Sequence, residues 1–261
     1  MPKTFKLQPV EEKLKIVQVT DCHVSADPDA IYREINPRRS IEQLLPVITD
    51  WGPDLILLTG DLAEDASDEA YAYLAARLVI ADVPVFTLPG NHDHAGKQAH
   101  HFVNTAVDKP LIYESKHWRV ILLNSAVEGQ VSGWFSQSDL ERLRKELCAS
   151  SKPSLIALHH QPLAVGSQWI DRYPLLHPEK FFSCLQSCEN VQAVVWGHIH
   201  QEFSDKHGEI DLLSAPSSSA NSLPGHDRFT FDDRGPACRW LMLDSKGGFE
   251  TGILRPEAMP A

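Results

Sequence analysis

Short apolar runs alternate with longer amphipathic stretches through the first part of the chain. The runs at 14–19, 55–58 and 85–88 are brief and bounded by turn-forming residues, so they predict buried β-strands. Between them, the stretches at 40–50 and 66–80 place apolar residues at helical spacing. This strand–helix–strand order favours a largely parallel sheet with right-handed crossovers.

Polar residues at the starts of these stretches predict where the helices begin. Ser40 is a candidate N-cap for the first helix, and either Asp65 or Ser67 opens the second. A third amphipathic stretch, at 136–147, begins Ser-Gln-Ser-Asp, a favourable helix start.

The second half of the chain continues the alternation and then changes. Strands are expected at 118–123, 154–158 and 192–196, with a further helix at 178–187. Beyond Gln201 short alternating runs are separated by Gly, Pro and Asp, which favours antiparallel strands that close a second sheet. Helices outside two sheets give an α/β fold with four layers, an α/β/β/α sandwich. The runs beyond Gln201 are 210–213, 229–231, 239–243 and 249–254.

Length and composition predict one domain over residues 1–261. A chain of 261 residues with 43% hydrophobic content can bury a large core. It contains no apolar run near the roughly 18 residues that cross a bilayer, and residues 1–6 lead into charge instead of an apolar signal core. We therefore expect a cytoplasmic protein without a membrane span. The five cysteines lack C-x-x-C spacing, so neither a disulfide framework nor a zinc ribbon is expected.

The formal net charge of −11 disfavours nucleic acid as a partner. Neutralising a row of phosphates needs a basic face, and the chain has no block of Lys or Arg. A small phosphate ester remains compatible, because bound divalent cations would reverse the local field. The expected partner is a small-molecule substrate, and a homo-oligomer is left open.

Five polar motifs each follow a predicted strand. Because strands of an α/β sheet present their carboxyl ends at one edge, we expect these side chains to meet there. Asp, His and Asn without thiolate suit hard or borderline divalent metals such as Mn, Fe or Zn, and two such ions sharing a carboxylate form a hydrolytic centre. The motifs are Asp21-Cys22-His23, Gly60-Asp61, Gly90-Asn91-His92-Asp93, His159-His160 and Gly197-His198-Ile199-His200.

In this order the motifs D-x-H, GD, GNH(D), H and GHxH resemble those of the calcineurin-like metallophosphoesterases. The stretches GNHD, LHHQPLAVGSQWID, WGHIHQE and APSSS further resemble the bacterial class III 3′,5′-cyclic-AMP phosphodiesterases, and this similarity runs from about Lys15 to Leu243. The resemblance implies a dinuclear enzyme that opens the cyclic diester to 5′-AMP. In that mechanism a hydroxide that bridges the two ions attacks phosphorus in line and expels the 3′ oxygen.

The resemblance also implies roles for individual residues. Asp61 bridges two divalent ions, Fe or Mn with Zn as an alternative. His92 and Asn91 act in catalysis: His92 contacts the phosphate and stabilises charge or protonates the leaving oxygen, while Asp93 is expected to orient it. The first ion is assigned to Asp21, His23 and His200, the second to Asn91, His159 and His198, and substrate binding to His23, Asp61, Asn91, His92 and His200.

Some readings stay open at this point. Trp169 either stacks on a purine or closes its own loop, and His160 either touches substrate or is structural. The role of Asp171 is open, and Arg38 and Arg39 either reach a phosphate or are solvated. The same chemistry could act on a glycerophosphodiester, a 2′,3′-cyclic nucleotide or a nucleotide-lipid pyrophosphate, and a non-catalytic scaffold is the alternative of another class. Seven histidines without a partner at ligand spacing are expected to lack a catalytic role: His94, His100, His101, His117, His177, His207 and His226.

Overall fold

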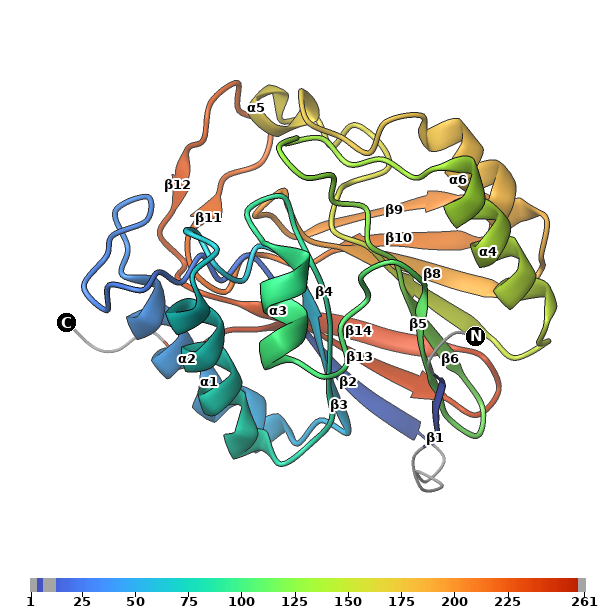
Figure 1. Cartoon of the computed structure of the whole chain (residues 1–261), viewed down its shortest axis with the longest axis horizontal. Coiled ribbons are helices and arrows are strands. Elements are labelled where there is room, and N and C mark those ends of the chain that lie inside the picture. Colours follow the sequence, from blue (N-terminus) through green and yellow to red (C-terminus); the bar gives the residue numbers. More distant parts are fainter. Residues whose placement is uncertain (1–3, 7–12, 258–261) are drawn as a thin grey trace.

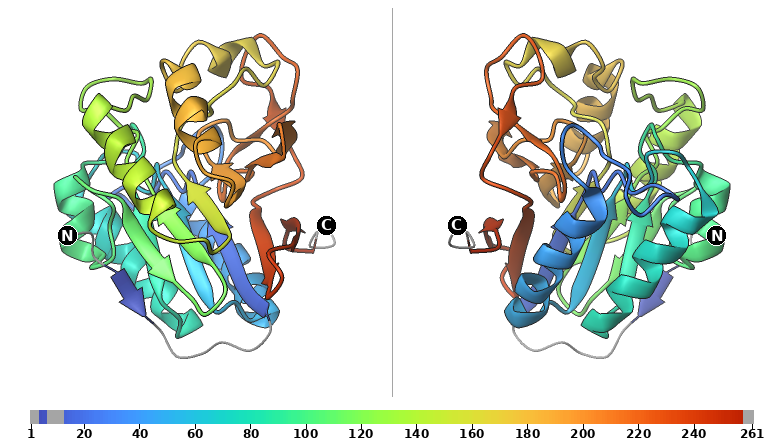
Figure 2. Two further views of the ribbon diagram at one scale, coloured as in Figure 1. Left: turned by 90° about the vertical axis from the view of Figure 1, so that its right-hand side faces the viewer. Right: turned by 90° about the vertical axis from the view of Figure 1, so that its left-hand side faces the viewer.

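Two β-sheets face each other with helices on their outer sides. The computed structural model describes residues 4–6 and 13–257. Helices α1 and α2 lie together on one side of the molecule (Figure 1), whereas α4 and α6 lie side by side on the other (Figure 2). The expected four layers are therefore confirmed. The single domain over 1–261 stays a prediction, since both ends of that range lie outside the described residues.

The first sheet has five strands in the order β14-β13-β2-β3-β4. Its strands β2, β3 and β4 are parallel, and all five residues of β3 are buried, which explains why the apolar run has no alternation. Strand β13 runs antiparallel to β2 and to β14. The strands are β2 (Lys13–Val19), β3 (Leu55–Thr59), β4 (Val85–Leu88), β13 (Cys238–Asp244) and β14 (Phe249–Leu254).

The second sheet has seven strands in the order β1-β5-β6-β7-β8-β10-β9. Strands β6, β7, β8 and β10 are parallel, while β5 and β9 are antiparallel to their neighbours β6 and β10. The strands are β1 (Thr4–Lys6), β5 (Leu111–Glu114), β6 (Arg119–Leu122), β7 (Ser154–Ala157), β8 (Val191–Trp196), β9 (Phe203–His207) and β10 (Ile210–Ser214), and a separate pair joins β11 (Asn221–Ser222) to β12 (Phe231–Asp232).

The expectation for the C-terminal strands was partly wrong. Strands β13 and β14 extend the first sheet instead of closing a second one, and β10 joins the other sheet parallel to β8. Phe229, expected in a strand, precedes β12 in a loop. Alternation of apolar residues predicts a half-buried strand but carries no information about which neighbour it pairs with.

Helix starts follow their capping residues. Asn36 caps α1 by accepting a hydrogen bond from the backbone N–H of Arg39, with Pro37 at the first helical position, so the expected cap Ser40 was wrong and lies inside the helix. Ser67 caps α2 as expected. The helices are α1 (Pro37–Trp51), α2 (Asp68–Leu78), the 3₁₀ turn η1 (Val79–Ala81), α3 (Ala95–His101), α4 (Gln137–Cys148), α5 (Gln168–Asp171) and α6 (Pro178–Gln186).

Three apolar clusters hold the layers together. One lies between the sheets and includes Leu57, Trp118 and Val195, all fully or almost fully buried. The other two seal the helices onto the outer faces, through α1 and α2 on the first sheet and α4 and α6 on the second. Each fully buried Leu, Val or Phe contributes roughly 1.5–3 kcal/mol. This rigid interior fixes the ends of the strands that carry the polar motifs.

Candidate metal centre

The five polar motifs meet where strands of both sheets end. Asp21, Asp61 and Asn91 follow β2, β3 and β4 of the first sheet, whereas His159 and His198 follow β7 and β8 of the second. The sequence led us to expect one edge of one sheet, and the structure shows instead a site between the carboxyl ends of two sheets. Six of the seven residues expected to bind metal are buried, and Asn91 is half-buried.

The backbone turns sharply at most of these residues. Non-glycine residues rarely adopt positive φ, which costs on the order of 1–3 kcal/mol each. Such strain persists only where the surrounding structure holds it, and here it directs the side chains of successive strand ends toward one point. The residues with positive φ at the site are Asp21 (53°), His23 (47°), Asp61 (51°), His198 (67°) and His200 (52°).

Glycines let these turns approach one another. A Cβ atom on Gly60 would lie 2.5 Å from His159 Nδ1 and 2.7 Å from the backbone nitrogen of Gly90. A Cβ on Gly90 would collide with the Asp61 carboxylate, and one on Gly197 would collide with the Thr20 hydroxyl. Gly197 thus lets the turn after β8 lie directly against Thr20 and Asp21.

Asp21, His23 and His200 form one group of ligand atoms. Their ligand atoms lie within 4.8 Å of one another. His23 Nε2 is 3.1 Å from His200 Nε2, which lies 3.4 Å from Asp21 Oδ1. The Asp21 carboxylate is fixed by the backbone N–H of His198, which it accepts at 3.0 Å.

His159, His198 and Asn91 form the second group. His159 Nε2 is 3.2 Å from Asn91 Oδ1 and 3.2 Å from His198 Nδ1. Asp61 stands between the groups: its Oδ2 is 3.3 Å from His159 Nε2 and 3.9 Å from His23 Nε2. Its other oxygen accepts the backbone N–H of His92 at 2.9 Å, which leaves Oδ2 facing both groups.

The outward nitrogens of the imidazoles are used by hydrogen bonds. His159 and His200 donate from Nδ1 to the carbonyls of Thr59 and Ala220, both at 2.7 Å. His198 donates from Nε2 to the carbonyl of Tyr173 at 3.0 Å, and His23 Nδ1 lies 2.7 Å from Glu64 Oε2. These bonds fix the tautomers, as partners of metal-binding histidines do.

As a result, the lone pairs of the remaining ring nitrogens point at one another and at the lone pairs of nearby oxygens inside the site. With Nδ1 of His23 and His200 both donating outward, their Nε2 atoms meet at 3.1 Å as two acceptors. Around His159 Nε2 the neighbours are likewise acceptors, namely Asn91 Oδ1 and Asp61 Oδ2. Acceptors at such distances repel unless positive charge lies among them. This donor set therefore fits divalent cations.

The pKa shifts of His159 and Asp61 also indicate that positive charge is favoured at this site. Burial lowers the pKa of His159, but the adjacent Asp61 carboxylate outweighs it and raises that pKa to about 9. Burial opposes ionisation of Asp61, yet His159 holds its pKa well below the ordinary value. Desolvation lowers the pKa of His198 to about 3, so its imidazole is neutral, the form that binds metals.

Serines of the loop at 217–219 support the first group from behind. The hydroxyls of Ser217 and Ser219 donate to the carbonyl of Asp21 at 2.8 and 3.0 Å, and that of Ser218 donates to the carbonyl of Thr20 at 2.9 Å. All three serines are buried. They hold the turn at Asp21 in its strained conformation.

Glu64, which the sequence did not single out, contacts His92. Its Oε2 lies 3.1 Å from His92 Nδ1. Burial acts to lower the pKa of His92, but the bond to Glu64 and the charge of Asp61 raise it to about 9. Burial likewise acts against ionisation of Glu64, and its histidine partners bring its pKa down to about 2. The spacing of three residues from Asp61, in the same loop, is the signal that could have identified it.

The expected pairing of Asp93 with His92 was wrong. The Asp93 carboxylate accepts the backbone N–H groups of Leu62, Ala63 and Gly90 at 2.9–3.2 Å, and the hydroxyl of Tyr71 at 3.0 Å. Asp93 therefore ties the Asp61 loop to the Asn91 loop.

The structure shows the contacts of four residues whose roles the sequence left open. Both ring nitrogens of His160 are engaged, with the Ser125 hydroxyl at 2.8 Å and the Val131 carbonyl at 3.0 Å. Arg38 donates to the carbonyls of Ser25 and Ala26, whereas exposed Arg39 forms no ion pair with another described residue. Asp171 accepts the backbone N–H groups of Val165 and Gly166 and so closes its own loop.

Trp169 lies between an apolar cluster and the candidate metal centre. It packs against the apolar cluster of α4 and α6, and its ring centroid lies 6.3 Å from that of His200. Of the remaining histidines, His94 caps α3, His101 lies 3.0 Å from Asp68, and His207 stacks on Phe182. None of these belongs to a ligand group found among the described residues.

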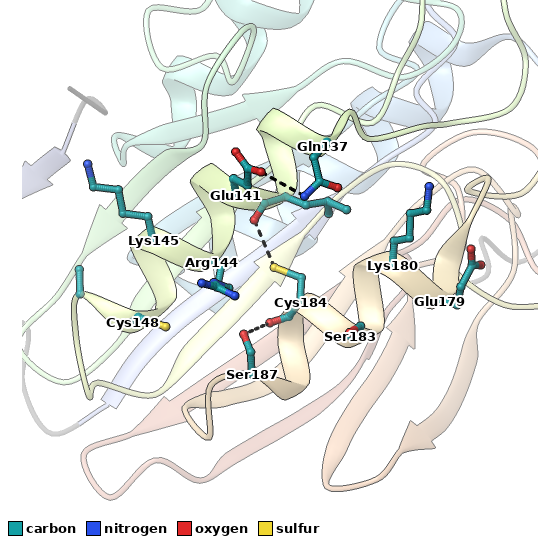
Figure 3. Close-up of a pocket in the computed structure, with 12 residues that line it drawn as sticks. Gln137, Glu141, Arg144, Lys145, Cys148, Glu179, Lys180, Ser183, Cys184 and Ser187 are labelled. Carbon is teal, nitrogen blue, oxygen red and sulfur yellow. Dashed lines mark hydrogen bonds between the residues drawn. The ribbon is translucent and has the colours of Figure 1, made fainter.

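A large hollow lies away from these residues. A groove of about 1120 Å³ runs between α4 and α6, lined by Arg144, Lys145 and Cys184 among others (Figure 3). No ligand group of the described chain lies in it. A smaller hollow of about 240 Å³ is lined by Asn91 and Asp93 and opens beside the acceptor cluster. Ligand chemistry, not volume, therefore locates the site.

Comparison with known proteins agrees with this location. The family profile described as calcineurin-like phosphoesterase matches residues 14–202, the span that holds all five motifs. The chain is 32% identical to the 3′,5′-cyclic adenosine monophosphate phosphodiesterase CpdA of Pseudomonas aeruginosa, over 92% of this chain and 89% of the relative. It is 34% identical to a 3′,5′-cyclic-nucleotide phosphodiesterase of a Nostoc species, over 96% and 97%.

Solved structures share the fold at low sequence identity. A dimetal phosphatase from Danio rerio superposes with a TM-score of 0.67 at 16% identity, over 94% of this chain and 99% of that one. A purple acid phosphatase from yellow lupin superposes with a TM-score of 0.63 at 13% identity, over 94% of this chain and 54% of that one. At these identities the likeness extends to the fold alone.

Proposed function

This chain belongs to the calcineurin-like phosphoesterase family, and from that premise we propose that it is a two-metal phosphodiesterase that hydrolyses 3′,5′-cyclic AMP to 5′-AMP. The observation that carries the proposal is the cluster of acceptors facing one another around His23, Asp61 and His159. The relatives named as cyclic-nucleotide phosphodiesterases, matched over most of their length, support the choice of substrate.

The two groups of ligand atoms suggest how the cations would be held. Asp21, His23 and His200 would bind one, and Asn91, His159 and His198 the other. Asp61 would contact both through Oδ2, which faces both groups. Imidazole, carboxylate and amide ligands without thiolate suit Fe or Mn, with Zn as the alternative.

Such cations, when bound, lower the pKa of a water molecule and neutralise phosphate oxygens. The chain supplies the remaining chemistry. Asn91 offers a neutral oxygen, which adds no negative charge against an incoming phosphate, while His23, Asp61 and His200 line the place where the phosphate binds. His92, half-buried beside the cluster, donates a proton to O3′ as the bond from phosphorus to that oxygen breaks.

Glu64 acts on His92 as a positioning residue. A carboxylate at Nδ1 orients the ring and favours its protonated form, so that the proton on Nε2 can be directed at the leaving oxygen. The same oxygen contacts His23 Nδ1 and so connects proton donation with the orientation of a ligand.

Two kinds of alternative remain: the same chemistry on another phosphodiester, or a protein without catalytic activity. A glycerophosphodiester, a 2′,3′-cyclic nucleotide or a nucleotide-lipid pyrophosphate would use the same donor set. A non-catalytic scaffold is disfavoured, because all seven expected ligands are present and converge. No helix within the described chain is long and apolar enough to cross a membrane. The cytoplasmic location belongs to the proposal, and cell fractionation tests it.

A substrate panel tests the proposal. Protein loaded separately with Mn, Fe and Zn, with metal content measured, is assayed against 3′,5′-cyclic AMP and the three alternative esters. We expect 3′,5′-cyclic AMP to give the highest kcat/KM and 5′-AMP as the product. A higher kcat/KM for one of the other esters would replace the substrate, and inactivity toward all four at full metal loading would favour the scaffold.

A further inference from the structure

Three aromatic rings and one arginine converge beside the candidate metal centre. They come from three separate segments: Tyr32 and Arg33 from the loop after β2, Trp169 from α5, and Phe229 from the loop before β12. The Arg33 guanidinium lies 4.2 Å from the ring centroid of Phe229, 5.7 Å from that of Tyr32 and 5.8 Å from that of Trp169.

This group directly adjoins the expected ligands. Tyr32 stacks on His23 with centroids 4.0 Å apart and planes 9° from parallel. Trp169 and Phe229 lie 6.3 and 6.1 Å from the His200 ring, and 5.2 Å from each other in an edge-to-face arrangement. A molecule with its phosphate at the metal centre would therefore extend onto these rings.

A strained turn presents Arg33. Tyr32 and Ile35 exchange backbone hydrogen bonds of 2.8 and 2.9 Å, and the two residues between them, Arg33 and Glu34, have φ of 45° and 71°. Positive φ at both central positions is the pattern of a type I′ turn, which Asn and Gly favour. The side chain of Arg33 is exposed, so packing in the core does not explain why a residue other than glycine occupies this strained position. Strain of this kind often marks a functional role.

Trp169 contributes an unsatisfied donor. Its indole Nε1–H is enclosed and has no acceptor among the described residues. Burying an unpaired donor costs free energy, and a small shift of the indole on ligand binding would bring this N–H to an acceptor on the ligand and offset that cost. This observation is independent of the ring geometry.

We propose that Arg33, Trp169 and Phe229 form the subsite that receives the purine base of the substrate. The base stacks on one aromatic face. The guanidinium of exposed Arg33, which lies 4.2 Å from the Phe229 centroid without ligand, moves off that ring to cover the other face of the base, as arginine and aromatic side chains do with unpaired bases. The inference rests on the proposed function and deepens it, since it assigns a place to the base of a nucleotide substrate. Of the alternative esters, the glycerophosphodiester has no base and would leave this subsite empty.

The strained turn allows a matched pair of variants. Arg33→Gly and Glu34→Gly both place glycine at a positive φ and relieve the same kind of strain, so neither should unfold the protein. Only Arg33→Gly removes the guanidinium from the rings. A second pair compares Phe229→Ala with Phe231→Ala, whose exposed ring lies two residues further along in β12.

The measured quantities are KM and kcat for two substrates, 3′,5′-cyclic AMP and a ribose 3′,5′-cyclic phosphate with a methoxy group in place of the base. Loss of one stacking partner should raise KM for cyclic AMP by roughly 5- to 150-fold, the equivalent of roughly 1–3 kcal/mol. We expect this rise for Arg33→Gly and Phe229→Ala, with kcat and the base-free substrate nearly unchanged. Glu34→Gly and Phe231→Ala should match the unmodified protein.

Adenosine binding separates this inference from the proposed function. Adenosine lacks phosphate, so its affinity, measured by calorimetry on the metal-loaded protein, does not depend on turnover. If the protein fails to hydrolyse cyclic AMP but binds adenosine more weakly in Arg33→Gly and Phe229→Ala, the proposed substrate fails and the base subsite stands. Equal KM for cyclic AMP in both members of each pair, or an adenosine affinity that neither variant weakens, would overturn the subsite.

Discussion

Glu64 Oε2 lies 3.1 Å from Nδ1 of His92, the residue expected to protonate the leaving oxygen. The same carboxylate oxygen lies 2.7 Å from Nδ1 of His23. One side chain outside the expected ligand set thus contacts both the expected proton donor and an expected ligand. Positioning groups of this kind change activity as well as metal affinity.

Glu64→Gln should reduce both kcat and metal affinity. The amide keeps the size of the side chain but loses the charge that pairs with His92 and His23. Loss of such a partner typically costs about 10- to 100-fold in metal affinity or activity. Metal affinity by competition with a chelator and kcat at saturating metal measure the two effects. Glu69→Gln, an exposed acid on α2, is the control and should change neither. Unaltered values for Glu64→Gln would remove its positioning role.

His92→Ala should leave metal content nearly intact and lower kcat by about 10²–10⁴-fold, because a positioned proton donor is lost and no expected ligand is. The loss should be smaller for a nitrophenyl phosphodiester, whose leaving group needs no proton. If His92 only stabilises charge on the phosphate, the two losses should be similar. His117→Ala is the control. Metal lost along with activity would contradict the assignment.

Asp61→Ala should be the most damaging change among the ligands. It removes the one carboxylate whose free oxygen faces both groups, and two cations roughly 3.5–4 Å apart then repel each other without a bridge. We expect metal content and activity to fall together. Elemental analysis and turnover measure this, and a variant that kept two ions with near-normal turnover would show that Asp61 is not the bridge.

Gly90→Ala should disrupt the site by crowding. Its added methyl would collide with the Asp61 carboxylate and with the backbone nitrogen of the same residue, and overpacking of this kind typically costs about 1–3 kcal/mol. Gly96→Ala, inside α3, has its nearest contact at 3.2 Å, on the His94 ring, and is the control. Denaturant unfolding of both variants is compared. Equal stability and equal metal content in the two proteins would argue against this role of Gly90.

The motifs expected to bind metal could be predicted from the sequence because each follows closely on a buried strand. Local order was enough there: a strand ends, the chain turns, and Asp21 or Asp61 lies at the turn. The placement of these strand ends in two sheets was not accessible, since an apolar run such as β7 does not specify its neighbours.

Residues whose role depends on tertiary neighbours were missed or misassigned. Asp93 adjoins His92 in sequence, yet its carboxylate turns to the backbone of Leu62 and Ala63, while Glu64 reaches His92 from another loop. Arg33 could not be identified from the sequence, because its partners Trp169 and Phe229 lie far along the chain.

The most direct test of the two-metal account is a titration of chelator-treated protein with Mn, in which bound metal and hydrolysis of 3′,5′-cyclic AMP are followed in the same samples. Seven ligands in two groups joined by Asp61 predict that activity rises with bound metal and levels off at two ions per chain. Full activity with one ion bound, or with none, would contradict it.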